Sequence, residues 1–228
     1  MKKFLKIFAL TVIIHNFGYL FAATTPTVVL EDVEISKESA NWLKVAVKFK
    51  FPVHPLQSKF QRSPKSKEDF VNLNYIDDVK VKLYICFSNE TQKATLRSLK
   101  KLDAEYYQYY SSEIEFLALK YKINTSFYAN FLFPIEIAER DGFISTYVKH
   151  IGHAVEISIG GIPLEFPESE RFLKYNPKDP KENNYIGKFK QQAQQNSSKN
   201  EGFLIPAHII SSQYLEGAGP VRRKKSSY

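Results

Sequence analysis

The stretch WLKVAVKFKF, residues 42–51, alternates apolar and mostly basic side chains with a period of two. Successive side chains of a β-strand point to opposite faces, so this period assigns each set to one face of a strand. One face carries Leu43, Val45, Val47, Phe49 and Phe51, and the other carries Lys44, Lys48 and Lys50. The pattern therefore predicts a strand with one face on a hydrophobic core and the other in solvent.

The same period recurs along the chain. Residues 79–87 alternate in this way after the turn-forming pair Asp77-Asp78, and further strands are expected over residues 28–35, 107–119, 126–133, 147–159 and 162–166. Gly160-Gly161 separates the last two, and paired glycines favour a two-residue hairpin. No helical pattern alternates regularly with these strands, which argues against parallel βαβ packing. We therefore expect a mainly β protein, folded as an antiparallel β-sandwich.

Two short helices are expected beside the strands. Residues 134–140 begin at Pro134 and are followed by Gly142, and these residue types are typical of a helix start and stop. Residues 182–195 space their apolar side chains in a roughly helical pattern. Residues 93–102 fit either a strand or a helix, and residues 56–68 are polar and predict a long loop.

The N-terminus has the pattern of a secretory signal peptide. Lys2 and Lys3 precede a mostly apolar stretch that ends at Ala22-Ala23. The uninterrupted part, residues 7–21, is short for a bilayer span of about 20 residues, although a retained N-terminal anchor is the alternative. We expect a signal peptide at residues 1–23, one sandwich domain at residues 24–214, a disordered basic tail at residues 215–228, and export to the periplasm or cell surface of a bacterium.

The charge of the chain is concentrated at its two ends. The formal net charge is +8, but three lysines lie in the signal peptide and four basic residues, Arg222, Arg223, Lys224 and Lys225, lie in the tail. The folded body is therefore nearly neutral, and we expect no nucleic-acid partner. The tail cluster fits either a contact with acidic lipid, lipopolysaccharide or an acidic partner, or a solvated chain end.

The residues that could support catalysis or metal binding lack the expected surroundings. Cys86 is the single cysteine, so the chain has no internal disulfide, and its place within a strand favours a structural thiol over a nucleophile. His150 and His153 are three apart and would point to opposite faces of a strand. Neither metal nor cofactor is expected. Glu113 and Glu115 share a strand face at a spacing that could suit a glycosidase, but without a second acidic cluster they read as a solvated face.

The stretch AEYYQYYSSEIEF, residues 104–116, raises the question of ligand contact. Alternation places Tyr107 and Tyr109 on one face with Glu113 and Glu115, and Tyr106 and Tyr110 on the other. We predict that the second pair is buried with Ile114 and Phe116. The first pair, with the two glutamates, is then the candidate contact surface for a ligand or partner, because exposed aromatic rings can bind a sugar or a protein.

Two further stretches, NFLFPIEIAERDG at residues 130–142 and NEGFLIPAHII at residues 200–210, carry a family resemblance. They resemble a group of exported immunoglobulin-like β-sandwich proteins that are found beside type IV pilus genes in some gut bacteria. The resemblance implies an immunoglobulin-like sandwich and an accessory role in pilus assembly or envelope contact, and it carries over no functional residue.

We therefore expect an exported, non-catalytic binding or structural protein that contacts another envelope or surface protein. One alternative is a carbohydrate-binding module that uses exposed tyrosines. Another is a hydrolase of unfamiliar type, with a pocket that joins Glu113, Glu115 or His153 to other polar groups.

Overall fold

The computed structural model describes residues 27–60, 62–63, 65–67, 70–95, 105–144, 148, 150–166, 170–172 and 184–210. The expected signal peptide and the basic tail from Arg222 to Lys225 lie outside these residues. No helix within the described ranges is long and apolar enough to cross a bilayer.

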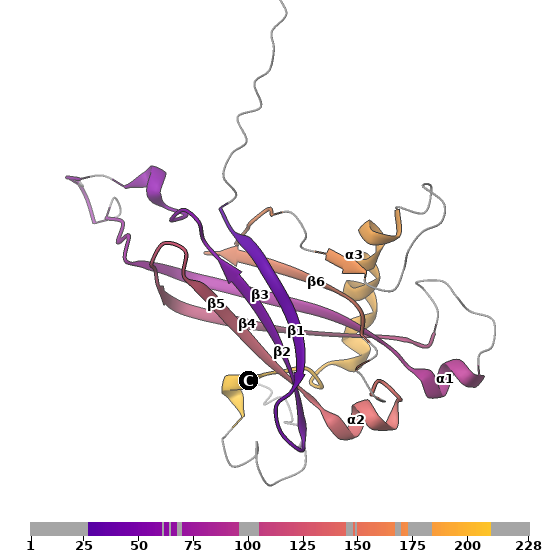
Figure 1. Cartoon of the computed structure of the whole chain (residues 1–228). Coiled ribbons are helices and arrows are strands. Elements are labelled where there is room, and N and C mark those ends of the chain that lie inside the picture. The colour runs from indigo at the N-terminus through magenta and orange to yellow at the C-terminus, as the bar shows by residue number, and fades with distance from the viewer. Residues whose placement is uncertain are drawn as a thin grey trace, which may run out of the picture.

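The described strands form two antiparallel sheets, which lie one over the other with their strands crossing at an angle (Figure 1). Sheet A has the order β1 (Val29–Lys37), β2 (Trp42–Lys50), β5 (Ser126–Pro134) and β9 (Ile205–Pro206). Sheet B has the order β4 (Tyr107–Lys120), β3 (Tyr75–Ser88), β6 (His150–Ile159) and β7 (Ile162–Pro163), and β8 (Glu170–Phe172) also pairs with β6. The mainly β, antiparallel sandwich expected from the sequence is confirmed.

The order of the strands is immunoglobulin-like. The first, second and fifth strands share one sheet, while the third, sixth and seventh share the other, which is the division of immunoglobulin domains. The fourth strand lies beside the third, and the short β9 occupies the position next to the fifth strand. The fold thus matches the immunoglobulin-like sandwich that the family resemblance implied.

The core lies between the sheets and follows the predicted alternation. On β2, Leu43, Val45, Val47 and Phe49 are buried, whereas the alternating lysines remain partly exposed. The inward residues of β3, from Val79 to Phe87, contribute the facing layer. Burial of apolar surface on both sheets therefore holds the two layers together.

The helix α2 (Ile135–Arg140) begins and ends where the sequence predicted. Pro134 precedes it in an extended conformation, and Gly142 follows with a φ of +71°. The N–H of Gly142 donates to the carbonyl of Glu139 at 3.1 Å, and the N–H of Phe143 donates to that of Ala138 at 2.7 Å. This is a Schellman cap, which requires the left-handed residue that glycine supplies.

Two other helices lie at the surface of sheet B and at the end of the sandwich. The expected helix over residues 182–195 is α3 (Asn184–Asn196). The ambiguous stretch from Lys93 begins within α1 (Glu90–Thr95), and its residues 96–102 lie outside the described part. The predicted long loop contains one short 3-10 turn, η1 (Gln57–Lys59).

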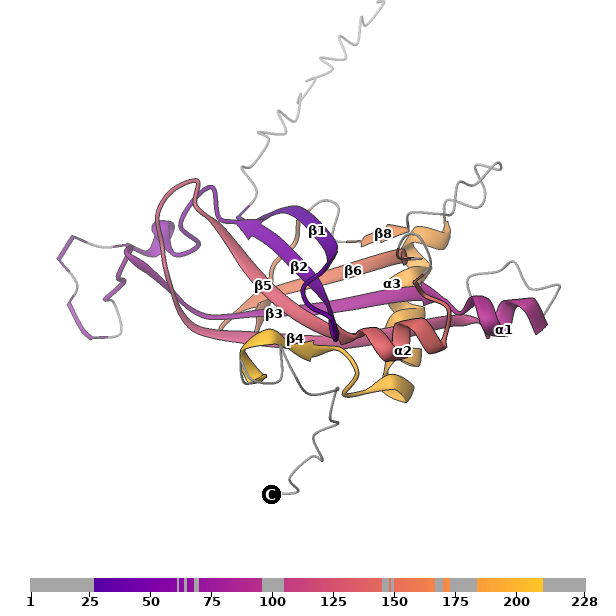
Figure 2. The same cartoon turned by 60° about the horizontal axis from the view of Figure 1, so that its bottom comes forward.

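Helices lie at one end of the sandwich and long connections lie at the other. In Figure 2, α1 and α2 lie at one end, and the β2–β3 and β4–β5 connections lie at the opposite end. The β6–β7 hairpin also reaches this second end, because the N–H of Gly160 donates to the carbonyl of Asp78 at 3.0 Å. Gly160 and Gly161 both have positive φ, as expected for this tight hairpin.

Candidate binding surface

The outer face of sheet B carries rows of opposite charge. Lys82 on β3 pairs across the strands with Glu113 on β4 and with Glu156 on β6, and Lys80 pairs with Glu115. The ammonium of Lys80 lies 3.7 Å from a carboxylate oxygen of Glu113 and 3.9 Å from one of Glu115. Two lysines of β3 therefore lie between two glutamates of β4 and one glutamate of β6, and cross-strand attraction favours this register.

The helix α3 is joined to this face by Glu156. The ammonium of Lys190 lies 3.0 Å from Oε1 of Glu156, and the amide of Gln194 donates to the same oxygen at 3.2 Å. The hydroxyl of Tyr84 donates to the other oxygen at 3.5 Å. Because Lys190 and Gln194 are one turn apart on α3, a single carboxylate fixes one face of the helix against the sheet.

A groove of about 490 Å³ runs beside these contacts, between the β6–β7 hairpin and α3. Its walls carry basic Lys80, Lys82 and Lys190 and acidic Glu156 and Glu165. Leu164 and Phe166 supply apolar surface, and both also pack against the core. The groove thus offers charges of both signs around an apolar strip. Glu113 and Glu115 are not among its lining residues.

The rest of this face is covered by α3. Phe189 and Ala193 of the helix are fully buried against Tyr84, Cys86 and Tyr109 of the sheet. The rings of Tyr109 and Phe189 have centroids 5.9 Å apart. Where α3 packs on it, sheet B therefore has an apolar layer on each face, one against sheet A and one against α3.

This second layer corrects the prediction for the tyrosines. Tyr106 and Tyr110 are buried as expected, and Tyr110 joins the core between the sheets. The prediction that Tyr107 and Tyr109 are exposed is wrong for Tyr109, which is 3% exposed beneath α3, and Tyr107 is half-buried. The alternation assigned the face of each ring correctly, but periodicity within one strand does not show that a distant helix covers that face. Glu113 and Glu115 are exposed, as predicted.

Cys86 lies under the same helix and is fully buried. Burial raises the pKa of its thiol well above the ordinary value. The thiolate is the nucleophilic form of cysteine, so the native environment keeps this group unreactive. The interpretation of Cys86 as a structural thiol agrees with this geometry.

The two histidines of β6 lie differently from the prediction. The rings of His150 and His153 are stacked, with centroids 5.4 Å apart and planes within 9°, whereas a regular strand would separate them to opposite faces. A β-bulge causes this, because Phe87 pairs with His150 and Cys86 with Gly152, which leaves Ile151 as an extra residue. In the described ranges, no three His, Cys, Asp or Glu side chains gather where they could hold a metal ion.

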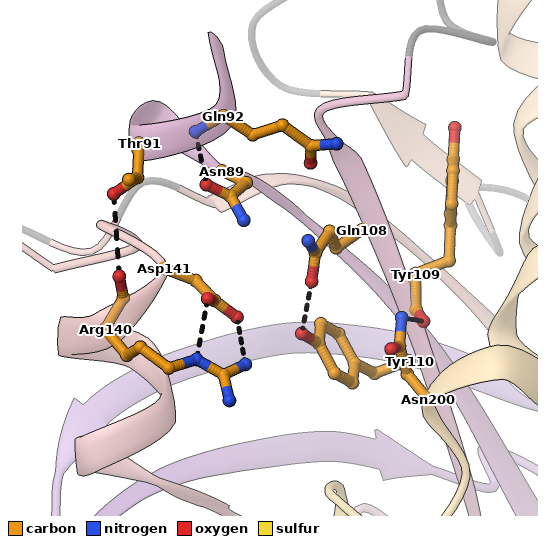
Figure 3. A network of polar contacts seen from close by, with 9 residues as sticks. All are labelled: Asn89, Thr91, Gln92, Gln108, Tyr109, Tyr110, Arg140, Asp141 and Asn200. Carbon is orange, nitrogen blue, oxygen red and sulfur yellow. Dashed lines mark hydrogen bonds and ion pairs between the residues drawn. The ribbon is translucent and has the colours of Figure 1, made fainter. Parts of the chain in front are cut away.

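Polar contacts close the helical end of the sandwich (Figure 3). The guanidinium of Arg140 donates to both carboxylate oxygens of Asp141 at 2.9 and 2.8 Å, and Asp141 is largely buried. The hydroxyl of Thr91 donates to the carbonyl of Arg140 at 3.5 Å, and Asn89 accepts from the N–H of Gln92 at 2.8 Å as a cap of α1. The hydrogen bond of Thr91 therefore joins α1 to the last residue of α2.

The same network reaches the first residues of β4 (Figure 3). The hydroxyl of Tyr110 donates to the side chain of Gln108 at 2.9 Å, and burial raises the pKa of this phenol. The amide of Asn200, in the 3-10 turn η3 (Ser197–Asn200), donates to the carbonyl of Tyr109 at 3.0 Å. The polar groups of this end are thus engaged with one another, which is the arrangement of a structural cap.

The sequence pattern does not predict the groove. Leu164 and Phe166 were assigned to a strand, but β7 ends at Pro163 and the chain leaves the sheet there. The sequence does contain a signal for the helix that forms one wall of the groove. Tyr84, Cys86 and Tyr109 are too apolar for a solvated face, so another element should cover them, and the amphipathic segment at residues 182–195 could do so.

No family model and no curated protein matches the chain. One solved structure that resembles it is a crystal structure of a protein from Akkermansia muciniphila, at 15% sequence identity. The match covers 70% of this chain and 76% of that chain, with a TM-score of 0.42. A likeness this distant assigns no function.

Proposed function

We propose that this protein is an exported, non-catalytic binding protein of the bacterial envelope, and that it holds a segment of another envelope or surface protein in the groove between the β6–β7 hairpin and α3. The observation that carries this proposal is the composition of the groove. Apolar Leu164 and Phe166 line the groove together with three lysines and two glutamates. Apolar surface beside polar and charged groups is the usual composition of a protein–protein contact.

The charges of the groove favour a polypeptide over an apolar small molecule. Pockets for small molecules are lined mostly by apolar side chains with few polar groups. Here Glu156 pairs with Lys190, and Lys80 lies beside Glu113 and Glu115, so positive and negative side chains alternate in and beside the groove. Such a surface selects a partner by its charge pattern, because a partner that placed a charge next to one of the same sign would be repelled.

A catalytic role has little support from the groups that the sequence singled out. Cys86 is buried and uncharged, and Glu113 and Glu115 lie on an open strand face with Lys80 between them. Neither group lines the groove, so neither could act on a molecule bound there. The carbohydrate alternative loses its pair of exposed rings, since Tyr109 is buried. An accessory role beside a pilus rests on the sequence resemblance alone.

The test is affinity capture from the native envelope with the tagged exported protein and two variants. Ser158→Arg places a long side chain into the groove, because Ser158 is one of its lining residues. Ser36→Arg makes the same change on β1 of the opposite sheet and serves as the matched control. Thermal melting of each variant establishes that it is folded before capture.

We expect the native protein and Ser36→Arg to recover the same protein partner. Ser158→Arg should lose about tenfold or more of its affinity, which corresponds to about 1.4 kcal/mol, because its side chain occupies the groove. Equal recovery by both variants would place the contact elsewhere on the molecule. Recovery of no specific protein would overturn the binding function itself.

A further inference from the structure

The end of the sandwich opposite the polar cap exposes an unusual amount of apolar surface. Of the nine large hydrophobic side chains that are exposed among the described residues, seven lie on the β2–β3 connection, on the β4–β5 connection or in the last turns of strand that these connections join. They are Val53, Phe60, Phe70, Tyr75, Leu117, Ile123 and Tyr128. Phe70 is 67% exposed and Ile123 is 63% exposed. Clustered exposure of this kind marks an interaction surface.

The base of this end is fixed by specific contacts. His54 is buried, its Nδ1 accepts from the N–H of Leu56 at 3.1 Å, and its Nε2 lies 2.9 Å from the carbonyl oxygen of Tyr75. The ring of His54 packs edge-on against Tyr121 with centroids 5.0 Å apart, and the N–H of Tyr121 donates to the carbonyl of Asn74 at 2.7 Å. The two connections therefore form one surface, and Figures 1 and 2 show them at the same end of the sandwich.

Basic side chains accompany the apolar ones. Lys59, Arg62, Lys65 and Lys67 of the β2–β3 connection are all exposed, and Lys122 is exposed on the β4–β5 connection. Residues 51–75 contain these four basic residues and two acidic ones, Glu68 and Asp69, so the connection has a net positive charge. Exposed Asp77 and Asp78 at the start of β3 are acidic residues of the same end, level with Ala118 and Leu117 of β4. Apolar tips with interspersed cations are the composition of surfaces that lie at a lipid interface.

The start of β1 places the N-terminal segment at the same end. Val29, the first residue of β1, pairs with Lys50, the last residue of β2, and the β2–β3 connection begins immediately afterwards. The apolar segment of residues 7–21 is joined to this point by residues 22–28. Seven residues reach at most about 25 Å. Whenever that segment lies in a bilayer, Val29 and the loop end beside it are held within about 25 Å of the lipid.

We propose that this loop end docks on the surface of an anionic bilayer. Phe70 and Ile123 enter the interfacial region, and the basic residues of the β2–β3 connection lie against the lipid phosphates. In this orientation the groove lies next to the docking surface, because the β6–β7 hairpin that forms one of its walls reaches the same end, so a partner segment can be held beside the membrane. The docking surface is separate from the groove and does not depend on the function proposed for it.

The test is sedimentation of the protein, purified in its exported form, with vesicles of phosphatidylcholine and phosphatidylglycerol, and with vesicles of phosphatidylcholine alone. We expect binding to the anionic vesicles that weakens as salt is added, because salt screens the charges. The variants Phe70→Ser with Ile123→Ser, and Lys65→Glu with Lys67→Glu, should each weaken binding about tenfold or more. Lys37→Glu with Lys199→Glu, which reverses two exposed lysines towards the helical end, should leave binding unchanged.

A second measurement detects the contact directly. Phe70→Trp introduces an indole at the loop end, and Trp42, the single natural tryptophan, is 2% exposed and remote from it on β2. Brominated lipid should quench the new indole and leave the fluorescence of Trp42 unchanged. Absence of quenching, or binding that survives both loop variants and is lost on truncation after Gly219, would overturn the loop end as the membrane surface. Ser158→Arg should bind vesicles normally, so failure of the groove does not affect this result.

Discussion

Glu31 shows how one irregular residue fastens three strands of sheet A. It is the extra residue of a β-bulge in β1, between Leu30, which pairs with Phe49, and Asp32, which pairs with Lys48. Its carboxylate lies 2.8 Å from the ammonium of Lys50 and accepts a hydrogen bond from the hydroxyl of Ser126 on β5. The hydrogen bonds from Lys50 and Ser126 lower the pKa of Glu31 from 4.5 to about 2.

This shift makes part of the stability depend on acidity. Because the folded-state pKa is lowered, the contribution of Glu31 is fully present above pH 4.5 and is lost as the pH falls towards 2. Glu31→Gln should lower the free energy of unfolding by about 1 kcal/mol at pH 7, a value discounted because the ion pair is partly solvated. The difference from the native protein should vanish near pH 2, as measured by urea unfolding across this range.

Glu34→Gln provides the matched control, since Glu34 is an exposed glutamate on the same strand. It should change the unfolding free energy by less than about 0.5 kcal/mol at each pH, as is usual for a surface position. A Glu31→Gln difference that stayed constant from neutral to acid pH would contradict a role for its charge.

At the scale of elements, the least predictable contact is the one between α3 and sheet B. Within each strand, the apolar period identified the core face of β2, β3 and β4, and the proline and glycine signals located α2. On the outer face, the apolar Tyr84, Cys86 and Tyr109 indicate that some element covers them, but no local pattern encodes which one. The covering element is a helix that begins at Asn184, and the place where it returns to the sheet depends on tertiary packing.

The groove was unpredictable, whereas the histidine pair had a sequence signal that regular alternation does not take into account. The bulge at Ile151 reverses the face of His150 relative to the following residues, and Gly152 directly beside it is a glycine inside a strand, which often marks a bulge. The groove exists because the chain leaves the sheet after Pro163, whereas the alternation in residues 162–166 predicted a continuous strand. The bulge in β6 and the early end of β7 are both departures from regular strands, and they shape this surface.

Phe189→Ala tests the docking of α3. Phe189 is fully buried between the helix and the sheet, and removing a buried phenylalanine ring costs about 3–5 kcal/mol in typical cores. We expect a loss of about 3 kcal/mol in unfolding free energy. We also expect Cys86, unreactive in the native protein, to react with a thiol reagent under native conditions, because its cover is loosened.

Cys86 is the single cysteine, so the reaction reports this site alone. Gln191→Ala changes an exposed residue of the same helix and should leave both the stability and the thiol protection unchanged. If Phe189→Ala left Cys86 protected at full native stability, α3 would not be the element that covers it.

At the scale of the whole molecule, the two sheets share one core. Buried side chains of β2 and β5 interleave with those of β3 and β6, as in the contact of Phe87 with Phe133, whose ring centroids are 5.4 Å apart. Neither sheet has another described layer that could cover its inner face. Separation of the sheets would therefore expose the apolar faces of both to water, and the described sandwich should unfold as a unit.

Two natural probes can test this cooperativity, because Trp42 lies on β2 of sheet A and Cys86 lies on β3 of sheet B. Both are buried, so each reports the loss of its own sheet. We expect tryptophan fluorescence and thiol labelling to give the same midpoint and slope in urea, as a single domain requires. In Phe189→Ala the thiol should become reactive at lower urea than the tryptophan transition, because α3 then opens while the shared core persists. Two separate midpoints in the native protein would instead divide the chain into two units.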